Sequence, residues 1–467
     1  MRSSKHHERR RLCLSLLSLT AILAVATGCS TSPGTASSLS SSNTGSSFVI
    51  GTDAPVAGVV SFQVQIESID AIDANGNSTP LLSGQPMVDF ARYNGLQTLL
   101  DMNNVPADTY TSISVTFGQA TIGYLQTQTG AAPTIQTEDA ELTTNTFQET
   151  LKTPLVVSQT GPVGIRLDFD LYKSIQVGSD GQITGMVTPT LNIKAVGPSD
   201  AGGYIDEFDA AVLGVDQQGE SFTIQGPHGR QFTVNVNGKT EWDNNEGLGD
   251  LSTSSIVQIS GTIDRADSTI DADEVAILSQ NGFYAAGQVT YVQPSSGTAS
   301  SFDLYVRGLL PTTTGISPGQ IAQVNLSGNE KYFIYWMHNP LTEFLFNSSG
   351  LVPGQHVSIG GPASGAANAQ AVTCKRIVLR HWGFNGTIVP GSISNNGTFQ
   401  MNVTGFAGLL VPGTVTVYTV PGTGWRNGLT GMSDITSSDS IRVVGLLLRD
   451  PVSGQLVILA HYVDLLQ

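Results

Sequence analysis

Apolar and polar residues alternate along much of the chain in short runs that are separated by glycine, proline and asparagine. The segments 59–66, 111–117 and 163–169 alternate with a period of two. That period is typical of strands with one buried and one solvated face, as in antiparallel sheets. Long helical periodicity is absent after the N-terminal segment. We therefore predict an all-β chain in which residues 48–197 form an antiparallel β-sandwich, with 95–101 as either one helical turn or a short strand.

One pattern occurs three times, at residues 251–261, 351–361 and 435–445. Each copy begins with an apolar residue, continues through a polar turn into an apolar alternation, and has glycine at the same offset. This order predicts a turn that leads into a strand. The glycine is expected where the chain bends or comes close to another backbone.

The segments around this pattern repeat as well. A Ser/Thr-Phe strand precedes each copy, at 221–224, 301–304 and 398–401. A further strand lies between the two, and an apolar strand follows. Five short strands in the same order indicate one supersecondary unit used three times. We place these repeats at 204–280, 281–380 and 381–467, after a linker at 197–203.

The N-terminal segment has the features of an export signal. A basic stretch with five Lys/Arg residues precedes an apolar run at 12–26, which is shorter than the ~20 residues that span a bilayer. The run ends in Ala-Thr-Gly-Cys29 and resembles a bacterial lipoprotein lipobox. The resemblance implies that residues 1–28 are a signal peptide and that Cys29 is lipidated. Ser30, in place of Asp, favours the outer membrane by resemblance to the Gram-negative sorting pattern.

The segment 29–47 is rich in Ser, Gly and Thr and predicts a flexible tether. Its reach is roughly 20–25 Å. Loss of residues 1–28 removes five of the 21 Lys/Arg and one of the 37 Asp/Glu residues, which leaves a net charge of −20. Such a chain repels phosphate backbones, so nucleic acid is not expected as a partner. The membrane, through the lipid, and an envelope glycan or protein are the expected partners.

The cysteines exclude an intramolecular disulfide in the processed chain. Cys13 leaves with the signal peptide and Cys29 is used for the lipid, so Cys374 alone remains. The processed chain also has five histidines, three of them in or beside the second repeat. Their spacing matches no known metal-ligand pattern, so we expect solvated or core-edge side chains, with no metal and no cofactor.

Two acidic loops are predicted to be turns or solvated loops. Asp73-Ala-Asn-Gly-Asn77 lacks the glycine and glutamate spacing of a calcium loop, and Asn-Gly is a strong turn signal. A second acidic cluster comprises Asp264, Asp267, Asp271 and Asp273, for which we predict a solvated loop, with weak surface binding of a cation as the alternative.

Two family resemblances follow from these motifs. Thr52-Asp-Ala-Pro55 together with Val105-Pro-Ala-Asp-Thr-Tyr110 makes residues 48–197 resemble domain-of-unknown-function family 4382, which is found in bacterial lipoproteins. That family has no assigned activity, so the resemblance implies no functional residue.

The repeats resemble domain-of-unknown-function family 5666, a small β-barrel similar to the oligonucleotide/oligosaccharide-binding (OB) barrel. The matching features are a leading Gly-x-Val/Ile strand, the Ser/Thr-Phe strand and the glycine segment. The second copy alone keeps the turn glycine, Gly354, where the others have Ser254 and Ser438. The resemblance implies three OB-like barrels.

The second repeat contains a dense aromatic run, 332–338. Alternation puts Tyr332 and Trp336 on one face and Phe333 and Tyr335 on the other, and both faces are apolar. One face must therefore meet something besides the core of its own barrel, either a neighbouring repeat or a ligand. We take Tyr332, Tyr335 and Trp336 as candidate ligand-binding residues.

No motif of a known catalytic class occurs in the sequence, so we assign no catalytic residue. The predicted function is non-enzymatic: a lipid-anchored cell-envelope protein with a structural or ligand-binding role. The alternative is a hydrolase of envelope glycans with an unrecognised carboxylate pair. A deep pocket with two facing carboxylates of raised pKa would favour the hydrolase.

Overall fold

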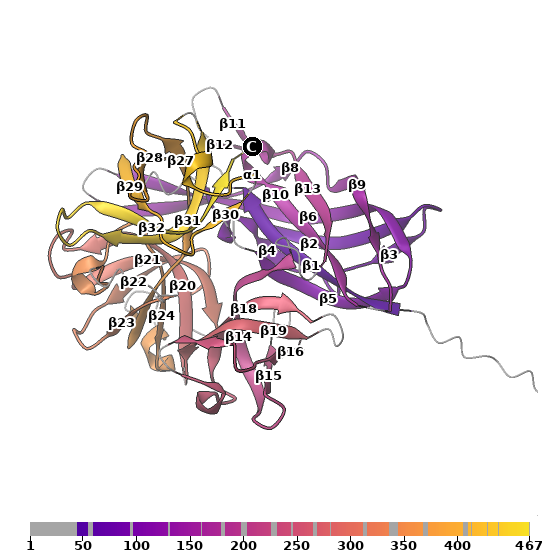
Figure 1. Cartoon of the computed structure of the whole chain (residues 1–467), viewed down its shortest axis with the longest axis horizontal. Coiled ribbons are helices and arrows are strands. Elements are labelled where there is room, and N and C mark those ends of the chain that lie inside the picture. The colour runs from indigo at the N-terminus through magenta and orange to yellow at the C-terminus, as the bar shows by residue number, and fades with distance from the viewer. Residues whose placement is uncertain are drawn as a thin grey trace, which may run out of the picture. The chain divides into compact units, whose positions relative to one another are not determined.

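The computed structural model describes a chain built almost entirely of strands, as predicted (Figure 1). It describes residues 44–466 except for positions 55–58, 94–96, 129–130, 160, 179–182, 198–202, 226–230, 244–245, 265–268, 281, 312–314, 336–343, 368–371, 405–409, 412, 427 and 438. Cys29 and most of the predicted tether lie outside these residues. No described helix is long and apolar enough to cross a membrane.

The N-terminal domain is a two-layer sandwich. One sheet has the order β13 (Leu191–Val196), β10 (Val163–Asp170), β1 (Thr44–Ala54) and β5 (Thr98–Pro106). The other has the order β3 (Ser78–Pro80), β2 (Val59–Asp73), β6 (Thr109–Gln128) and β7 (Ala131–Asp139), with β4 (Met87–Asp89) on β2 and β9 (Thr146–Val156) on β6. Phe62 and Phe117 lie 5.0 and 5.6 Å from Phe169 across the core, between ring centroids.

Two details differ from the sequence prediction, and a third decides between two predicted alternatives. β1 and β10 run parallel, although the other pairs in these two sheets are antiparallel. β1 begins at Thr44, so the last residues of the predicted 29–47 tether belong to a strand. Of the two alternatives for 95–101, the described part is strand, because β5 begins at Thr98.

Short elements complete this domain. They are the 3-10 helix η1 (Phe90–Arg92), the helix α1 (Leu171–Ser174) and a small sheet of β11 (Ile175–Val177), β12 (Ile183–Val187) and β8 (Glu141–Leu142). The Asp170 side chain accepts the backbone N–H of Lys173 and so caps α1.

Each of the three following sheets has the same strand order. In sequence order, the first barrel has β14 (Ile205–Asp216), β15 (Ser221–Gln225), β16 (Gln231–Asn235), β18 (Ile256–Ile263) and β19 (Ile270–Ser279). The second has β20 (Phe283–Gln293), β21 (Ser301–Leu310), β22 (Ile321–Asn325), β24 (His356–Gly361) and a split fifth strand, β25 (Val372–Thr373) with β26 (Arg376–Arg380). The third has β27 (Trp382–Ile388), β28 (Thr398–Thr404), β29 (Thr414–Tyr418), β31 (Ser440–Arg449) and β32 (Leu456–Leu465).

Strands one to three form a meander, strand one pairs with strand four, and strand four pairs with strand five. Strand five then pairs in parallel with strand three and closes the barrel, as β19 does with β16. This is the order of an OB-type barrel.

Further short elements occupy matching places in the barrels. β17 (Glu241–Trp242), β23 (Lys331–Ile334) and β30 (Gly424–Arg426) each pair in parallel with the fifth strand. The 3-10 helices η5 (Leu248–Asp250), η6 (Ser348–Gly350) and η8 (Met432–Asp434) each precede the repeated turn, and η7 (Ala363–Ala366) occurs in the second barrel.

The repeated glycine has the role that its sequence pattern predicts. A Cβ atom on Gly261 would collide with the carbonyl oxygen of Asp271, and one on Gly445 with that of Leu459. At both glycines the register to the fifth strand shifts, as in a β-bulge. Gly361 of the second barrel would place a Cβ atom 3.1 Å from the Cα atom of Cys374. Glycine therefore allows the fourth and fifth strands to approach closely.

The hydrophobic clusters cross the boundaries between these bodies. Phe48 and Leu99 of the N-terminal domain belong to the same cluster as the core of the first barrel. Val60 belongs to the cluster of the third barrel, and Leu446 of the third barrel to that of the second. Residues 42–467 accordingly form one compact unit.

Candidate functional site

The aromatic strand β23 has packing contacts on both faces over its described length. The Tyr332 ring meets the edge of Phe346 at 5.7 Å and packs against the core of the second barrel, and burial raises its pKa to about 12. On the other face, Tyr335 is 4% exposed, and its hydroxyl donates to Glu274 Oε2 of the first barrel at 3.0 Å. Phe333 joins the same inter-barrel cluster. The spare face thus packs on a neighbouring repeat at Tyr335, which is not an open stacking surface, whereas Tyr332 is half-buried. Trp336, the third candidate, lies outside the described residues.

Three histidines come together in space, which their sequence positions did not suggest. The rings of His381 and His461 stack with centroids 4.7 Å apart, and His356 Nδ1 lies 3.0 Å from the His381 carbonyl oxygen. Burial lowers all three pKa values, with Arg380 adding to the effect at His356 and His381. The pKa falls to about 3 at His381 and to about 2 at His461. These side chains are neutral and packed, at the edges of barrel cores.

Within the described part of the chain, the remaining candidate ligands form no metal centre. Cys374 is buried in the core of the second barrel, where burial raises its pKa to about 12. Among the described residues, no group of three or more His, Cys, Asp or Glu side chains is arranged to hold a metal ion. His228 and His338 lie outside the described part of the chain.

The acidic loop at 73–77 is a turn, as predicted. The Asp73 carboxylate accepts the backbone N–H groups of Asn75 and Asn77, both at 2.8 Å, and Gly76 has a φ of +86°. These hydrogen bonds lower the pKa of Asp73. In the second acidic cluster, Asp271 accepts from Asn235 Nδ2 at 3.1 Å.

A buried polar junction connects three of the bodies, and sequence reasoning did not find it. Asp209 of β14 is 5% exposed and accepts from Tyr284 at 2.8 Å and from Gln258 at 3.0 Å. Arg92 of the N-terminal domain and Arg380 of the second barrel lie 3.2 and 3.3 Å from its carboxylate oxygens. A local signal existed, because Arg380 directly follows an apolar run on a strand whose other residues are largely buried.

Several carboxylates have a raised pKa because they are buried. Asp89 accepts the backbone N–H of Phe62 at 2.9 Å within the N-terminal domain. Burial also raises the pKa of Asp168 on β10 and of Asp464 on β32, and both acids are near Arg166 and Arg442.

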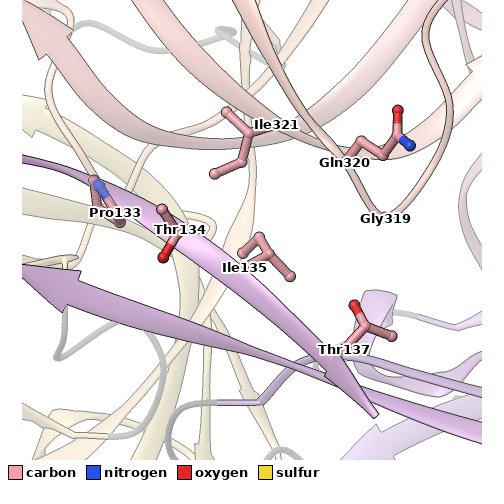
Figure 2. Close-up of a pocket in the computed structure, with 7 residues that line it drawn as sticks. All are labelled: Pro133, Thr134, Ile135, Thr137, Gly319, Gln320 and Ile321. Carbon is pink, nitrogen blue, oxygen red and sulfur yellow. The ribbon is translucent and has the colours of Figure 1, made fainter. Parts of the chain in front are cut away.

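A recess of about 450 Å³ lies between β7 and the turn that precedes β22. Figure 2 shows the strand β7 on one side and the turn at Gly319 on the other. Its lining comprises Pro133, Thr134, Ile135, Thr137, Gly319, Gln320 and Ile321. No charged side chain is among them, so this recess is not the carboxylate-lined pocket that a glycosidase needs.

Comparison with known proteins identifies the first of these bodies. Residues 46–185 match the family model described as "Domain of unknown function (DUF4382)". The match confirms the resemblance predicted for the N-terminal domain. The DUF4382 region thus contains β2, β6 and β7, and hence one wall of the recess.

The comparisons with curated proteins and with solved structures assign no fold or function. No curated protein matches the chain. Two chains among the solved structures match, and one of them is titled "drosophila Unr CSD456". It is 10% identical, the match covers 56% of this chain and 97% of that chain, and the TM-score is 0.15. At that TM-score we infer neither fold nor function from it.

Proposed function

We propose that this protein is a lipid-anchored protein of the bacterial cell envelope, held at the outer membrane, with a non-enzymatic structural or ligand-binding role. The observation that carries the proposal is the short apolar run that ends in Cys29 after a basic stretch. The DUF4382 match supports it, because that family is found in bacterial lipoproteins.

The proposal extends to the repeats, which we place in domain-of-unknown-function family 5666. Their shared strand order and shared close-approach glycines support one ancestral barrel used three times. Continuous hydrophobic clusters support a rigid block. A rigid block on a flexible polar tether suits a module that presents a surface within a limited distance of a membrane.

The test is the anchor itself. Cys29→Ala should leave the protein unprocessed or release it from the detergent phase, because the lipid attaches to that sulfur. Cys13→Ala is the matched control, since Cys13 lies within the segment that is removed. Detergent partitioning of Cys29→Ala that equals the wild type would refute the anchor.

The second candidate function is hydrolysis of an envelope glycan. Asp168 and Asp464 favour it, because burial raises the pKa of both acids while Arg166 and Arg442 are near both. If they act as an acid and base pair, Asp464→Asn should abolish release of reducing sugar from purified peptidoglycan. Asp434→Asn, at an exposed 3-10 helix, should leave it unchanged. A wild-type protein without such release excludes this alternative.

A further inference from the structure

The recess between β7 and the Gly319 turn has a fixed apolar floor. Ile135 and Ile321 approach it from its two sides, and both pack against the hydrophobic cluster of the third barrel (Figure 2). Because three bodies of the protein hold these two side chains in place, the floor is formed before any ligand arrives.

The rim of the recess is polar but uncharged. Thr134 and Thr137 contribute hydroxyl groups and Gln320 contributes an amide, and all three residues are exposed. Hydroxyl and amide groups both donate and accept hydrogen bonds. They therefore suit a partner that also carries groups of both kinds, as alcohols do. A charged ligand would lose hydration here without meeting an opposite charge.

The residues at the outer edge of β7 disfavour an extended peptide as the ligand. β7 is the last strand of its sheet, so its outer backbone edge could in principle pair with an added strand. Pro133 lies in β7 and has no N–H to donate, and the strand ends in Glu138 and Asp139. Proline and acidic residues at an edge oppose strand addition.

We propose that this recess binds a neutral saccharide of one or two rings, with the C–H face of a ring on Ile135 and Ile321 and its hydroxyls on the threonine and glutamine rim. The volume of about 450 Å³ lies in the range of small-molecule sites, ~300–1,000 Å³. The inference deepens the ligand-binding part of the proposed function and gives it a chemical class. It places the site between the DUF4382 domain and the second barrel, away from the aromatic strand β23.

The experiment is a titration of the full-length protein in detergent with neutral disaccharides, cellobiose and N,N′-diacetylchitobiose, followed by NMR chemical shifts. Glucuronic acid and glucosamine serve as charged probes. We expect saturable binding of at least one neutral disaccharide and at least tenfold weaker binding of the charged sugars. No saturable binding of either disaccharide would overturn the proposal, as would equal binding of the charged probes.

Two variants on one strand make the location testable. Thr137→Glu places a carboxylate at the rim and should weaken disaccharide binding at least tenfold. Gln136→Glu adds the same charge on the next residue, which does not line the recess, and should bind as the wild type does. Both positions are exposed, so neither change should alter the fold. Equal affinity of the two variants would overturn the location. The detergent partitioning of Cys29→Ala tests the anchor independently, so either claim can fail alone.

Discussion

The imidazole rings of His381 and His461 stack at an interplanar angle of 13° with their centroids 4.7 Å apart. His381 immediately precedes the first strand of the third barrel and His461 lies in its fifth strand, while His356 of the second barrel contacts the His381 carbonyl. Tyr335 meets the His381 ring edge-on at 5.7 Å. Neutral imidazoles therefore take part in the contact between the second and third barrels, alongside the apolar residues that the two barrels share.

The first prediction is that acid destabilises this protein well above the pH at which carboxylates titrate. In the folded protein, the pKa values of the three histidines lie below the ordinary 6.5. They are about 3 for His381 and about 2 for His461, and the pKa of His356 is also lowered. Unfolding therefore takes up protons below pH 6.5, and the stability present above that pH is lost as the pH falls. Each histidine should remove about 1.4 kcal/mol per pH unit below 6.5. Urea unfolding at pH 7.5, 6.0 and 5.0 measures this.

The arginines near the cluster act in this direction. Arg380 is near both His356 and His381, and Arg426 is near His461. Burial raises the pKa of Asp89 and Asp464, so the protonation of these acids stabilises the folded state as the pH falls. This opposing contribution applies above their ordinary pKa of 3.8. His461→Phe keeps an aromatic ring in the stack and removes one titrating group, so it should flatten the pH dependence by about 1.4 kcal/mol per unit. An unchanged slope would contradict the role of His461.

The strands and the bulge glycines could be predicted from the sequence because their causes are local. Alternation fixes which side of a strand is buried, and Gly261 and Gly445 stand at one offset in a repeated pattern. The histidine cluster and the Asp209 junction could not be predicted. Asp209 and Arg380 are 171 positions apart, and no local pattern records which barrel faces meet.

The aromatic run 332–338 could also be predicted from the sequence only in part. Its two-sided apolar pattern correctly implied a second contact, but the pattern could not distinguish a ligand from a neighbouring barrel. The contact of Tyr335 with Glu274 decides for the barrel at that position. The recess could not be predicted from the sequence, because Thr137 and Gln320 lie on segments with ordinary strand and turn composition.

The second prediction concerns the bulge glycine of the third barrel. Gly445→Ala should lower stability by about 1–3 kcal/mol, because the new methyl group collides with the Leu459 carbonyl oxygen of the paired strand. Gly431→Ala is the matched control in the same barrel, where a Cβ atom would meet nothing within 4 Å. Thermal unfolding of the two variants decides, and equal melting temperatures would refute the close-approach role.

The third prediction explains why the second repeat alone keeps its turn glycine. Gly354 has a φ of +92°, and a Cβ atom there would collide with Val411 and lie 3.3 Å from Leu447 Cδ2, both in the third barrel. Gly354→Ser should cost about 1–3 kcal/mol from the backbone conformation and the collision together. Gly413→Ser is the control in the third barrel, at a φ of +95° with nothing within 4 Å of a Cβ atom, so it separates the backbone effect from the contact between barrels.

The fourth prediction concerns the buried carboxylate of Asp209. Asp209→Ala should destabilise the protein by about 3–5 kcal/mol, because it leaves Arg380 buried without that counter-charge. Lys173→Ala is the contrasting change: its ion pair with Asp170 has a lysine side chain that is 63% exposed, and surface pairs are worth about 0–1 kcal/mol. Urea midpoints of the two variants measure the difference, and a loss below 1 kcal/mol at Asp209 would refute the prediction.

The last prediction concerns how independently the bodies fold. The Gly/Ser-rich composition of the linker at 197–203 predicts first cleavage there and in 30–47, and an independently folded fragment 204–467. The hydrophobic cluster that the N-terminal domain shares with the first barrel changes the expectation that fragment 204–467 folds independently. Phe48 and Leu99 lie in one cluster with Phe208 of the first barrel, so separating the domains would expose apolar surface on both.

We therefore expect the chain to unfold in one transition and the two fragments to stay together after cleavage at 198–202. Gel filtration of the cleaved protein should show both fragments in one peak. Phe48→Ala should destabilise the whole unit by about 3–5 kcal/mol, because it opens a cavity in a cluster that both domains share. If the N-terminal domain and fragment 204–467 instead elute separately and keep their melting temperatures, the shared cluster contributes nothing to stability. In that case the domains are independent, as their sequence composition alone implies.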